Sequence, residues 1–238
     1  MSATSRRRRE RLTGQDPKPR SRYMRPAFLA IVLGIAALIG VAMMLGGGGA
    51  SADSLPTASN NMKGSANAPV EIENWSDFQC PACKMFAETI EKQLAQTLIP
   101  EGQVRLVFRQ MAFMGDESVQ AASASECAAE QGQFWPYHDR LFAEQKARNS
   151  GAFSKANLKR YGAELGLEAA SFYGCVDNNL AVARILSEGQ IAKQKGVQKT
   201  PTLFVNGRKI EGVPTWEMMQ QAISSATVMV PVPSGRGL

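Results

Sequence analysis

Histidine is almost absent from this chain of 238 residues, and cysteine is scarce. The single histidine, His138, argues against metal sites and acid–base sites that depend on histidine. The four cysteines form an even number, which suits an oxidising compartment if the chain is exported. We therefore expect neither a metal nor a cofactor.

The body of the chain also lacks an excess of charge. Nine of the 27 basic residues and two of the 21 acidic residues lie within residues 1–26, which leaves 18 basic and 19 acidic residues in the remainder. Charge therefore gives the body no affinity for nucleic acid, and we expect no nucleic-acid partner. We interpret residues 1–26 as a basic cytoplasmic tail. The alternative is contact of Arg6 to Arg9 with nucleic acid or anionic lipid.

Residues 27–45 contain no charged side chain. As a helix, these 19 residues would span roughly 28 Å, about the hydrocarbon core of a bilayer. The nearby positive charge lies on the N-terminal side, which predicts a single-pass transmembrane anchor in the cell membrane. The N-terminus would be cytoplasmic and the body extracytoplasmic, in the periplasm or at the cell exterior. The alternative is a signal peptide cleaved near Ala52, after the small residues Ala50 and Ser51, which would secrete the body.

A Cys-x-x-Cys motif, Cys80-Pro81-Ala82-Cys83, follows an apolar run at 70–74 that predicts a strand. A helix is predicted from Pro81 onward, because apolar residues recur at spacings of four, three, four and four. These residues are Cys83, Ala87, Ile90, Leu94 and Leu98. Cys83 should then face the core. Cys80 lies at the first helical position, where free N–H groups and the helix dipole favour an anion.

This layout of strand, cysteine pair and helix is typical of a thiol–disulfide redox site. Two alternatives are half of a zinc site and an inert structural disulfide. A structural zinc site needs four ligands, and only Cys127, Cys175 and His138 remain, at an unusual spacing.

The remaining pattern predicts an α/β domain at 64–230, between a flexible Gly-rich linker at 46–63 and a disordered tail at 231–238. A second strand is predicted at 104–110, and a strand, an Asn-Gly turn and a further strand at 202–210. A final helix is predicted at 216–226. Between these elements lies a helical insertion at about 116–195, with helices predicted at 118–131, 134–146, 154–165, 168–178 and 181–195.

The segments Gly64–Val70, Asp77–Cys83, Gln131–Asp139 and Thr200–Gly207, in this order, resemble the DsbA family of exported thiol–disulfide oxidoreductases. The match covers about residues 64–226. The chain looks closest to membrane-tethered or lipoprotein-like members. The resemblance implies a thioredoxin fold with an inserted α-helical subdomain, here preceded by one transmembrane helix.

The resemblance also implies a mechanism. Cys80 would be the nucleophile that bonds to the substrate, and Cys83 would resolve the mixed disulfide. Thr200-Pro201 resembles the family's cis-proline loop, whose backbone would hold an extended substrate. The expected partners are protein dithiol or disulfide substrates and a membrane redox partner for turnover. We expect a monomer.

Two positions depart from the family. The dipeptide between the cysteines is Pro81-Ala82, where the strongly oxidising member has Pro-His, so we expect a less oxidising site. An acidic residue often lies six positions before the first cysteine, and here that residue is Asn74. Asp77 could replace it as the proton acceptor; otherwise it is a solvated aspartate at the start of the loop.

Cys127 and Cys175 lie on two predicted helices of the insertion. Export and the even cysteine count favour a structural disulfide between them, which would close a loop of about 49 residues. Such a loop stabilises a fold by roughly 4 kcal/mol on the chain-entropy model. The alternative is two buried free thiols. His138 is expected to pack in the insertion or lie on its surface, without a catalytic role.

Three functions are compatible with these features. The first is an extracytoplasmic oxidase that forms disulfides in exported proteins. The second is a reductase or isomerase of the cell envelope with the same fold, because the direction of exchange depends on the redox potential. The third is a chaperone-like binding module whose cysteines are incidental.

Overall fold

The computed structural model describes residues 61–228. The predicted tail at 1–26, the predicted anchor at 27–45, most of the predicted linker and the segment 231–238 lie outside the described residues. Within residues 61–228, no helix is both long and apolar enough to cross a membrane.

A mixed sheet forms the centre of the described chain, with strands in the order β1-β3-β2-β4-β5. The strands are β1 (Met62–Lys63), β2 (Val70–Ser76), β3 (Val104–Gln110), β4 (Thr202–Val205) and β5 (Arg208–Glu211). β2 pairs parallel with β3 and antiparallel with β4, so β2 is a central strand, and all its residues except the half-buried Glu71 and Glu73 are buried. The loop that carries Cys80 therefore leaves the sheet from a strand that is paired on both sides.

One face of the sheet is covered by the helical segment that follows β2 and by the last helix. The segment comprises α2 (Pro81–Phe86), a π-helical turn η2 (Ala87–Glu91) and α3 (Lys92–Gln96), and the last helix is α9 (Trp216–Val228). Ile72 of β2 packs there with Phe86, Ile90 and Ile223. Side chains alternate along a strand, so Asn74 and Ser76 lie on the same face as Ile72. They lie toward the helix that carries the cysteines.

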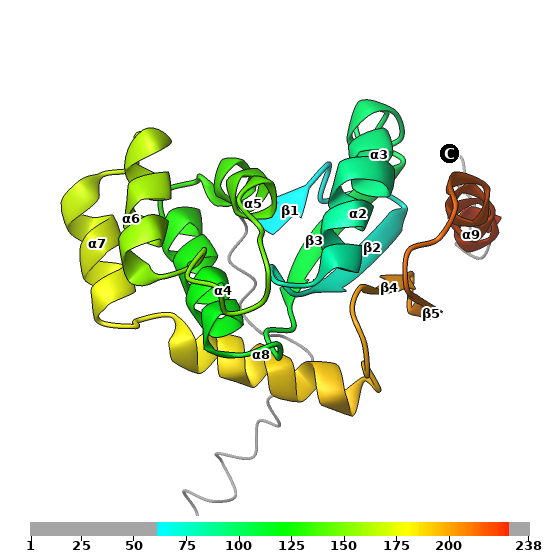
Figure 1. The fold of residues 1–238 in the computed structure, drawn as a ribbon. Coiled ribbons are helices and arrows are strands. Elements are labelled where there is room, and N and C mark those ends of the chain that lie inside the picture. Colours follow the sequence, from blue (N-terminus) through cyan, green and yellow to red (C-terminus); the bar gives the residue numbers. More distant parts are fainter. Residues whose placement is uncertain (1–60, 229–238) are drawn as a thin grey trace, which may run out of the picture. The chain divides into compact units, whose positions relative to one another are not determined.

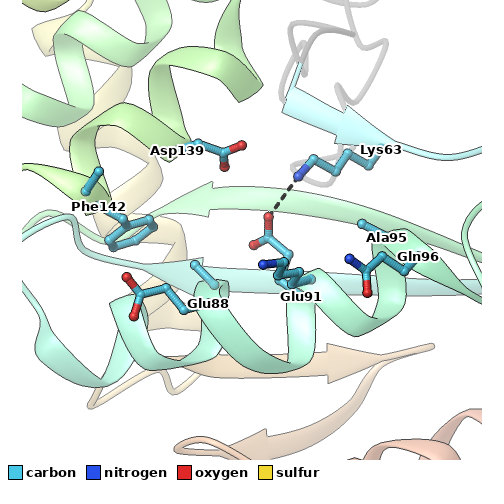
Figure 2. A pocket seen from close by; sticks show the side chains of 10 residues that line it. Lys63, Glu88, Glu91, Ala95, Gln96, Asp139 and Phe142 are labelled. Atoms are coloured by element: carbon cyan, nitrogen blue, oxygen red, sulfur yellow. Dashed lines mark hydrogen bonds and ion pairs between the residues drawn. The ribbon is translucent and has the colours of Figure 1, made fainter.

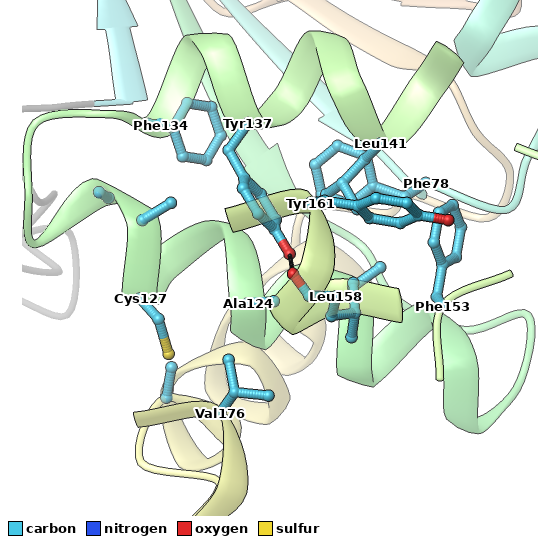
Figure 3. Packing of buried hydrophobic residues seen from close by; sticks show 14 of the residues in the cluster. Phe78, Ala124, Cys127, Phe134, Tyr137, Leu141, Phe153, Leu158, Tyr161 and Val176 are labelled. Atoms are coloured by element: carbon cyan, nitrogen blue, oxygen red, sulfur yellow. Dashed lines mark hydrogen bonds between the residues drawn. The ribbon is translucent and has the colours of Figure 1, made fainter. Parts of the chain in front are cut away.

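The insertion consists of α4 (Asp116–Ala129), α5 (Phe134–Ala143), α6 (Lys155–Glu164), α7 (Ala169–Asp177) and α8 (Val182–Gln194). Figure 1 shows these helices gathered beside the sheet, with α8 leading back toward β4. Their core is rich in aromatic side chains, including Phe134, Tyr137 and Tyr161 (Figure 3). The same core contains Phe78 of the cysteine loop, so the insertion and the loop share one hydrophobic cluster.

A disulfide joins Cys127 of α4 to Cys175 of α7, with Cα atoms 5.9 Å apart. Its sequence separation of 48 residues corresponds to a stabilisation of roughly 4 kcal/mol on the chain-entropy model. Both sulfurs are buried, so the bond belongs to the core of the insertion.

The α/β fold with its helical insertion is confirmed for residues 61–228, and the predicted helices and strands are all present within a few residues of their expected ends. Two features differ. Met62 and Lys63, which the sequence pattern placed in the linker, form β1 against β3, because backbone pairing leaves no signal in two residues. The helix after the cysteines contains the π turn η2, which the regular apolar spacing conceals.

Candidate active site

The two cysteines of the motif lie where β2 gives way to α2. Cys80 is the N-cap residue, with extended backbone angles, and Pro81 is the first helical residue, where a missing N–H costs little. The sequence pattern placed Cys80 one position further into the helix. Both are buried, but Cys80 is 8% exposed and Cys83 only 1%, so Cys80 is the more accessible of the two. Both are free thiols in this structure.

The two thiols differ strongly in acidity. The pKa of Cys80 is lowered to about 6, chiefly by the hydrogen bond from the Cys83 thiol and against the opposing effect of burial. The Thr200 hydroxyl and the backbone N–H groups of Ala82 and Cys83 contribute to the same lowering. Burial, together with the neighbouring Cys80, raises the pKa of Cys83 well above its usual value. At neutral pH the reduced pair therefore consists of a thiolate at Cys80 and a protonated thiol at Cys83.

Thr200 and Pro201 come from the segment before β4 and lie against Cys80. The peptide bond between them is cis. The Cys80 thiol group contacts the Thr200 carbonyl oxygen at 3.4 Å. Residues 120 positions apart in the sequence thus meet at one sulfur atom. The Thr200 backbone is adjacent to Cys80, where it can form hydrogen bonds with an extended peptide.

The floor of the site is polar but uncharged. Ser76 and Asn74 are 1% and 2% exposed and lie on the sheet face beneath the α2 helix. The Ser76 hydroxyl and the Asp77 N–H contact the Cys83 thiol and lower its pKa, although burial outweighs them. The Asn74 amide oxygen has no hydrogen-bond partner among the described residues. A neutral amide thus stands where related sites often have an acid.

Asp77 is a buried anchor of the loop and not a solvated residue. It is 1% exposed, and one carboxylate oxygen accepts hydrogen bonds from the Gln79 N–H and the Ser118 hydroxyl at 2.8 and 2.7 Å. The other oxygen accepts from the N–H groups of Phe113 and Met114 at 2.9 and 3.0 Å. The reading of Asp77 as a solvated loop residue was wrong. Its oxygens are already occupied by four donors, which leaves it poorly placed to accept a proton from Cys83.

Two glutamines complete this anchoring, and the sequence pattern gave no sign of them. Gln79 is 3% exposed, and its side-chain amide donates to Ser118 and accepts from the Asn149 N–H. Gln145, just after α5, donates to the carbonyl oxygens of Phe78 and Cys80 at 2.7 and 3.1 Å. The insertion thereby holds the backbone on both sides of the reactive cysteine. Only the tertiary structure reveals these contacts, which join residues 39 to 70 positions apart.

The other candidate ligands do not extend this pair into a zinc site. Cys127 and Cys175 are bonded to each other, and His138 contacts Asp139 at 2.8 Å and faces Glu91 of η2 at 3.7 Å. Trp75 is buried against Met111 and Val197 and has a packing role. Redox exchange remains the chemistry that the free pair can perform.

A family model described as Thioredoxin matches residues 57–225. The chain belongs to the thioredoxin family. Among curated proteins, the chain is 32% identical over 169 residues to the Na(+)/H(+) antiporter NhaA 3 of Salinispora tropica, a match that covers 70% of this chain and 24% of the antiporter. It is 24% identical over 170 residues to disulfide bond formation protein D of Bacillus subtilis, covering 67% of this chain and 73% of that protein. The chain thus spans about a quarter of the length of the antiporter it matches.

Solved structures of DsbA proteins have the same fold. Oxidised BdbD from Bacillus subtilis superposes with a TM-score of 0.66 at 23% identity, covering 71% of this chain and 92% of BdbD. DsbA2 from Pseudomonas aeruginosa superposes with a TM-score of 0.57 at 27% identity, covering 73% of this chain and 97% of DsbA2. These comparisons confirm the resemblance to the DsbA family that the sequence motifs indicated.

Proposed function

We propose that this protein is a thiol–disulfide oxidoreductase that oxidises dithiols of exported proteins through the pair Cys80 and Cys83. The observation that carries the proposal is the asymmetry of the pair. Cys80 is the more accessible cysteine and its pKa is lowered to about 6, beside the more deeply buried Cys83 and the backbone of Thr200. The similarity to disulfide bond formation protein D supports the oxidising direction.

In the oxidising direction, the enzyme starts with a disulfide between Cys80 and Cys83. A substrate thiolate attacks the Cys80 sulfur, the bond to Cys83 breaks, and Cys83 leaves as a thiolate that takes up a proton. A second substrate thiolate then attacks the substrate sulfur of the mixed disulfide. Cys80 leaves with the electron pair, and the substrate carries the new disulfide. Because the Cys80 thiolate is stabilised, it is a good leaving group in this last step.

The substrate would bind as an extended segment beside the cis Thr200-Pro201 bond. The Thr200 backbone would exchange short β-type hydrogen bonds with it, which requires no particular side chain in the substrate. Pro81 and Ala82 separate the cysteines, and Cys80 remains the more accessible of the two. Two electrons then reside on the reduced pair, and a redox partner in the membrane would remove them.

The location that suits this role is extracytoplasmic. We propose that residues 27–45 anchor the chain in the membrane with residues 1–26 in the cytoplasm. The alternative is secretion after cleavage near Ala52. N-terminal sequencing of the mature protein distinguishes the two, because a cleaved chain begins at Asp53.

A reductase or isomerase of the cell envelope is the second candidate. Ala82 favours it, because alanine offers no side-chain charge or hydrogen bond to stabilise the Cys80 thiolate. The floor residue Asn74 also offers no charge for proton transfer. The choice between the two candidates depends on the potential of the pair, where about 30 mV corresponds to 1.4 kcal/mol for two electrons.

The test compares both directions of exchange with one preparation of the full chain. The oxidised protein is mixed with reduced, denatured ribonuclease, and the reduced protein with insulin. We expect the oxidised protein to restore ribonuclease activity by forming its disulfides. The reduced protein should reduce the disulfides of insulin slowly.

Two cysteine variants serve as controls. Cys80→Ser should abolish both reactions, whereas Cys83→Ser should accumulate a mixed disulfide through Cys80. Full activity of Cys80→Ser would show that Cys80 does not carry out the exchange and would overturn the proposal. Rapid insulin reduction without ribonuclease oxidation would establish the reductase instead.

A further inference from the structure

A second polar cluster lies in the interior, apart from the cysteine pair. His138 of α5 is 0% exposed and Glu91 of η2 is 2% exposed. The His138 Nε2 atom faces a Glu91 carboxylate oxygen, Oε2, at 3.7 Å. Neither atom has a hydrogen-bond partner among the described residues. Two buried polar atoms therefore face each other across a gap that is too long for a direct hydrogen bond.

The other polar atoms of this cluster are occupied. The Lys63 ammonium group donates to Glu91 Oε1 at 3.0 Å, and His138 Nδ1 lies 2.8 Å from an oxygen of Asp139. A carboxylate oxygen accepts hydrogen bonds, so the contact with Asp139 favours the proton on Nδ1, and in the neutral imidazole Nε2 then carries the lone pair toward Glu91.

The cluster opens into a cavity of about 390 Å³ between the cysteine helix and α5. Lys63, Glu91 and Asp139 line it, together with Glu88 and Phe142 (Figure 2). Figure 2 shows the Glu91 carboxylate between Lys63 and the α5 side of the cavity. The cavity has room for water molecules and is lined by Glu91, whereas His138 lies behind its wall.

The π-helical turn places Glu91 in this position. η2 ends at Glu91, and the helix resumes as α3 at Lys92. Without the extra residue of the π turn, Glu91 would be rotated by about a quarter of a turn along the helix, away from its present place. π turns of this kind occur frequently at functional sites. The π turn therefore ends at the buried carboxylate that lines the cavity.

We propose that Glu91 and His138 bind a divalent transition-metal ion of the zinc type between Oε2 and Nε2, with water from the cavity as the remaining ligands. Zinc–nitrogen and zinc–oxygen bonds of about 2.0 to 2.2 Å sum to slightly more than the 3.7 Å gap, so an ion that lies to one side of the line between the two atoms can bind both. Imidazole together with carboxylate favours zinc-like ions over calcium or magnesium. Asp139 is a positioning residue, because its hydrogen bond to Nδ1 fixes the tautomer that leaves Nε2 free.

This proposal departs from our expectation of no metal, which relied on the scarcity of histidine. It is independent of the redox function, because the ion contacts neither Cys80 nor Cys83. Lys63 provides a distinguishing feature. Its ammonium group competes electrostatically with any cation at Glu91, so removal of this charge should strengthen metal binding.

The test measures Zn²⁺ binding to the full chain without an affinity tag, by titration against a chromophoric chelator. The protein is kept oxidised, so that neither Cys80 nor Cys83 offers a thiolate. We expect one saturable Zn²⁺ per chain and a higher unfolding temperature with zinc. Glu91→Gln should weaken the affinity at least about tenfold. Lys63→Met should strengthen it, a result that a purely structural ion pair would not produce.

Glu88→Gln is the matched control, because Glu88 lines the same cavity but is exposed. Its affinity should stay within about twofold of the unmodified protein if binding depends on the His138 and Glu91 pair. Co²⁺ should give ligand-field bands without a thiolate band. Absence of stoichiometric binding would overturn the proposal. Equal weakening by Glu88→Gln and Glu91→Gln would also overturn it, as would unchanged affinity in Glu91→Gln.

Discussion

At the scale of single residues, the active site depends on a division of labour between Cys80 and Cys83. The Cys83 thiol donates to Cys80, and this hydrogen bond is the largest cause of the lowered pKa of Cys80. Burial keeps Cys83 protonated, so it remains a donor at neutral pH. The low pKa of Cys80 is therefore produced mainly by a hydrogen bond from its buried neighbour Cys83, without a charged side chain.

Removing this donor should raise the pKa of Cys80. In reduced Cys83→Ala, we expect the pH at which alkylation of Cys80 is half-maximal to move from about 6 toward 9, the ordinary value. Cys83→Ser keeps a hydroxyl donor and should shift less. Since the thiolate is the reactive form, alkylation at pH 7 should be slower in the alanine variant. Rates of carboxamidomethylation against pH test this, and coincident midpoints in the two variants would contradict it.

Asp77 should be critical for stability because it holds four donors. Asp77→Ala leaves the N–H groups of Gln79, Phe113 and Met114 and the Ser118 hydroxyl without their acceptor. At about 1 to 3 kcal/mol for each buried unsatisfied group, we expect a loss of at least about 3 kcal/mol in the free energy of unfolding. Ser118→Ala removes one of these donors and should cost about 1 kcal/mol. Urea unfolding of the oxidised proteins measures both, and equal costs would refute this role for Asp77.

The residues of the site were predictable from the sequence to different degrees. The spacing of Cys80 and Cys83 and the apolar positions that follow indicate which thiol is buried, because helix periodicity is a local property. Asp77 and Gln145 act through contacts 36 to 67 positions away, and no local pattern contains that information. The neighbouring sequence made Asp77 look solvated, whereas the tertiary fold buries it.

At the scale of elements, a buried ionic network joins the insertion to the sheet. Glu188 of α8 accepts from the Gln110 N–H at the end of β3 at 2.7 Å. The Gln110 side chain donates to Glu126 of α4, which also pairs with Arg184 of α8. The end of β3 is therefore connected to two helices that start and finish the insertion. Burial is the main reason that the pKa of Glu188 is raised to about 7.

This raised pKa makes the stability of the protein depend on pH. Glu188 holds its proton in the folded state over a range in which the unfolded chain, with a pKa of 4.5, has lost it. Its contribution to stability is thus present below about pH 4.5 and lost as the pH rises through about 7. Glu188→Gln keeps an acceptor for Gln110 and cannot ionise. We expect the variant to gain about 2 kcal/mol relative to the unmodified protein between pH 5 and pH 8.

Urea unfolding at the two pH values measures this difference. Glu130→Gln, at an exposed carboxyl group just after α4, is the control and should show no such gain. An equal stability change of Glu188→Gln at both pH values would show that Glu188 ionises normally in the folded protein.

Most elements were predictable because their signals are local. The alternation in β3, the Asn-Gly turn before β5 and the glycines between the insertion helices each fix an element from neighbouring residues. β1 and η2 were not, for opposite reasons. β1 has only two residues and forms because β3 offers an unpaired edge, whereas η2 interrupts a helix whose apolar spacing looks regular.

At the scale of the whole molecule, the fold brings two distant segments to one sulfur atom. β2 delivers Cys80, β4 delivers the cis Thr200-Pro201 bond, and the insertion between them anchors the loop from the other side. The order of these segments in the sequence indicated the resemblance to the DsbA family. The redox potential of Cys80 and Cys83 could not be predicted from the sequence, because it depends on small differences in free energy between the oxidised and the reduced pair.

Those differences can be bounded from the acidity of Cys80. A thiol pKa of about 6 instead of 9 stabilises the reduced form by about 1.4 kcal/mol at pH 7, which corresponds to roughly 30 mV for two electrons. Partial solvation of the sulfur reduces this figure. The effect alone therefore moves the potential only modestly in the oxidising direction, in keeping with an alanine at position 82.

The potential should change its dependence on pH near 6. Below that value, reduction takes up two protons with two electrons, so the potential falls by about 59 mV per pH unit. Above it, Cys80 remains a thiolate and one proton suffices, so the slope should halve to about 30 mV. Equilibration of the full chain with glutathione from pH 5 to pH 8 gives this curve. Ala82→His should raise the potential and move the break to lower pH, because the imidazole adds a donor for the thiolate. A constant slope of 59 mV per pH unit from pH 5 to pH 8 would mean that Cys80 has an ordinary pKa. It would contradict the proposal that a stabilised Cys80 thiolate is a good leaving group.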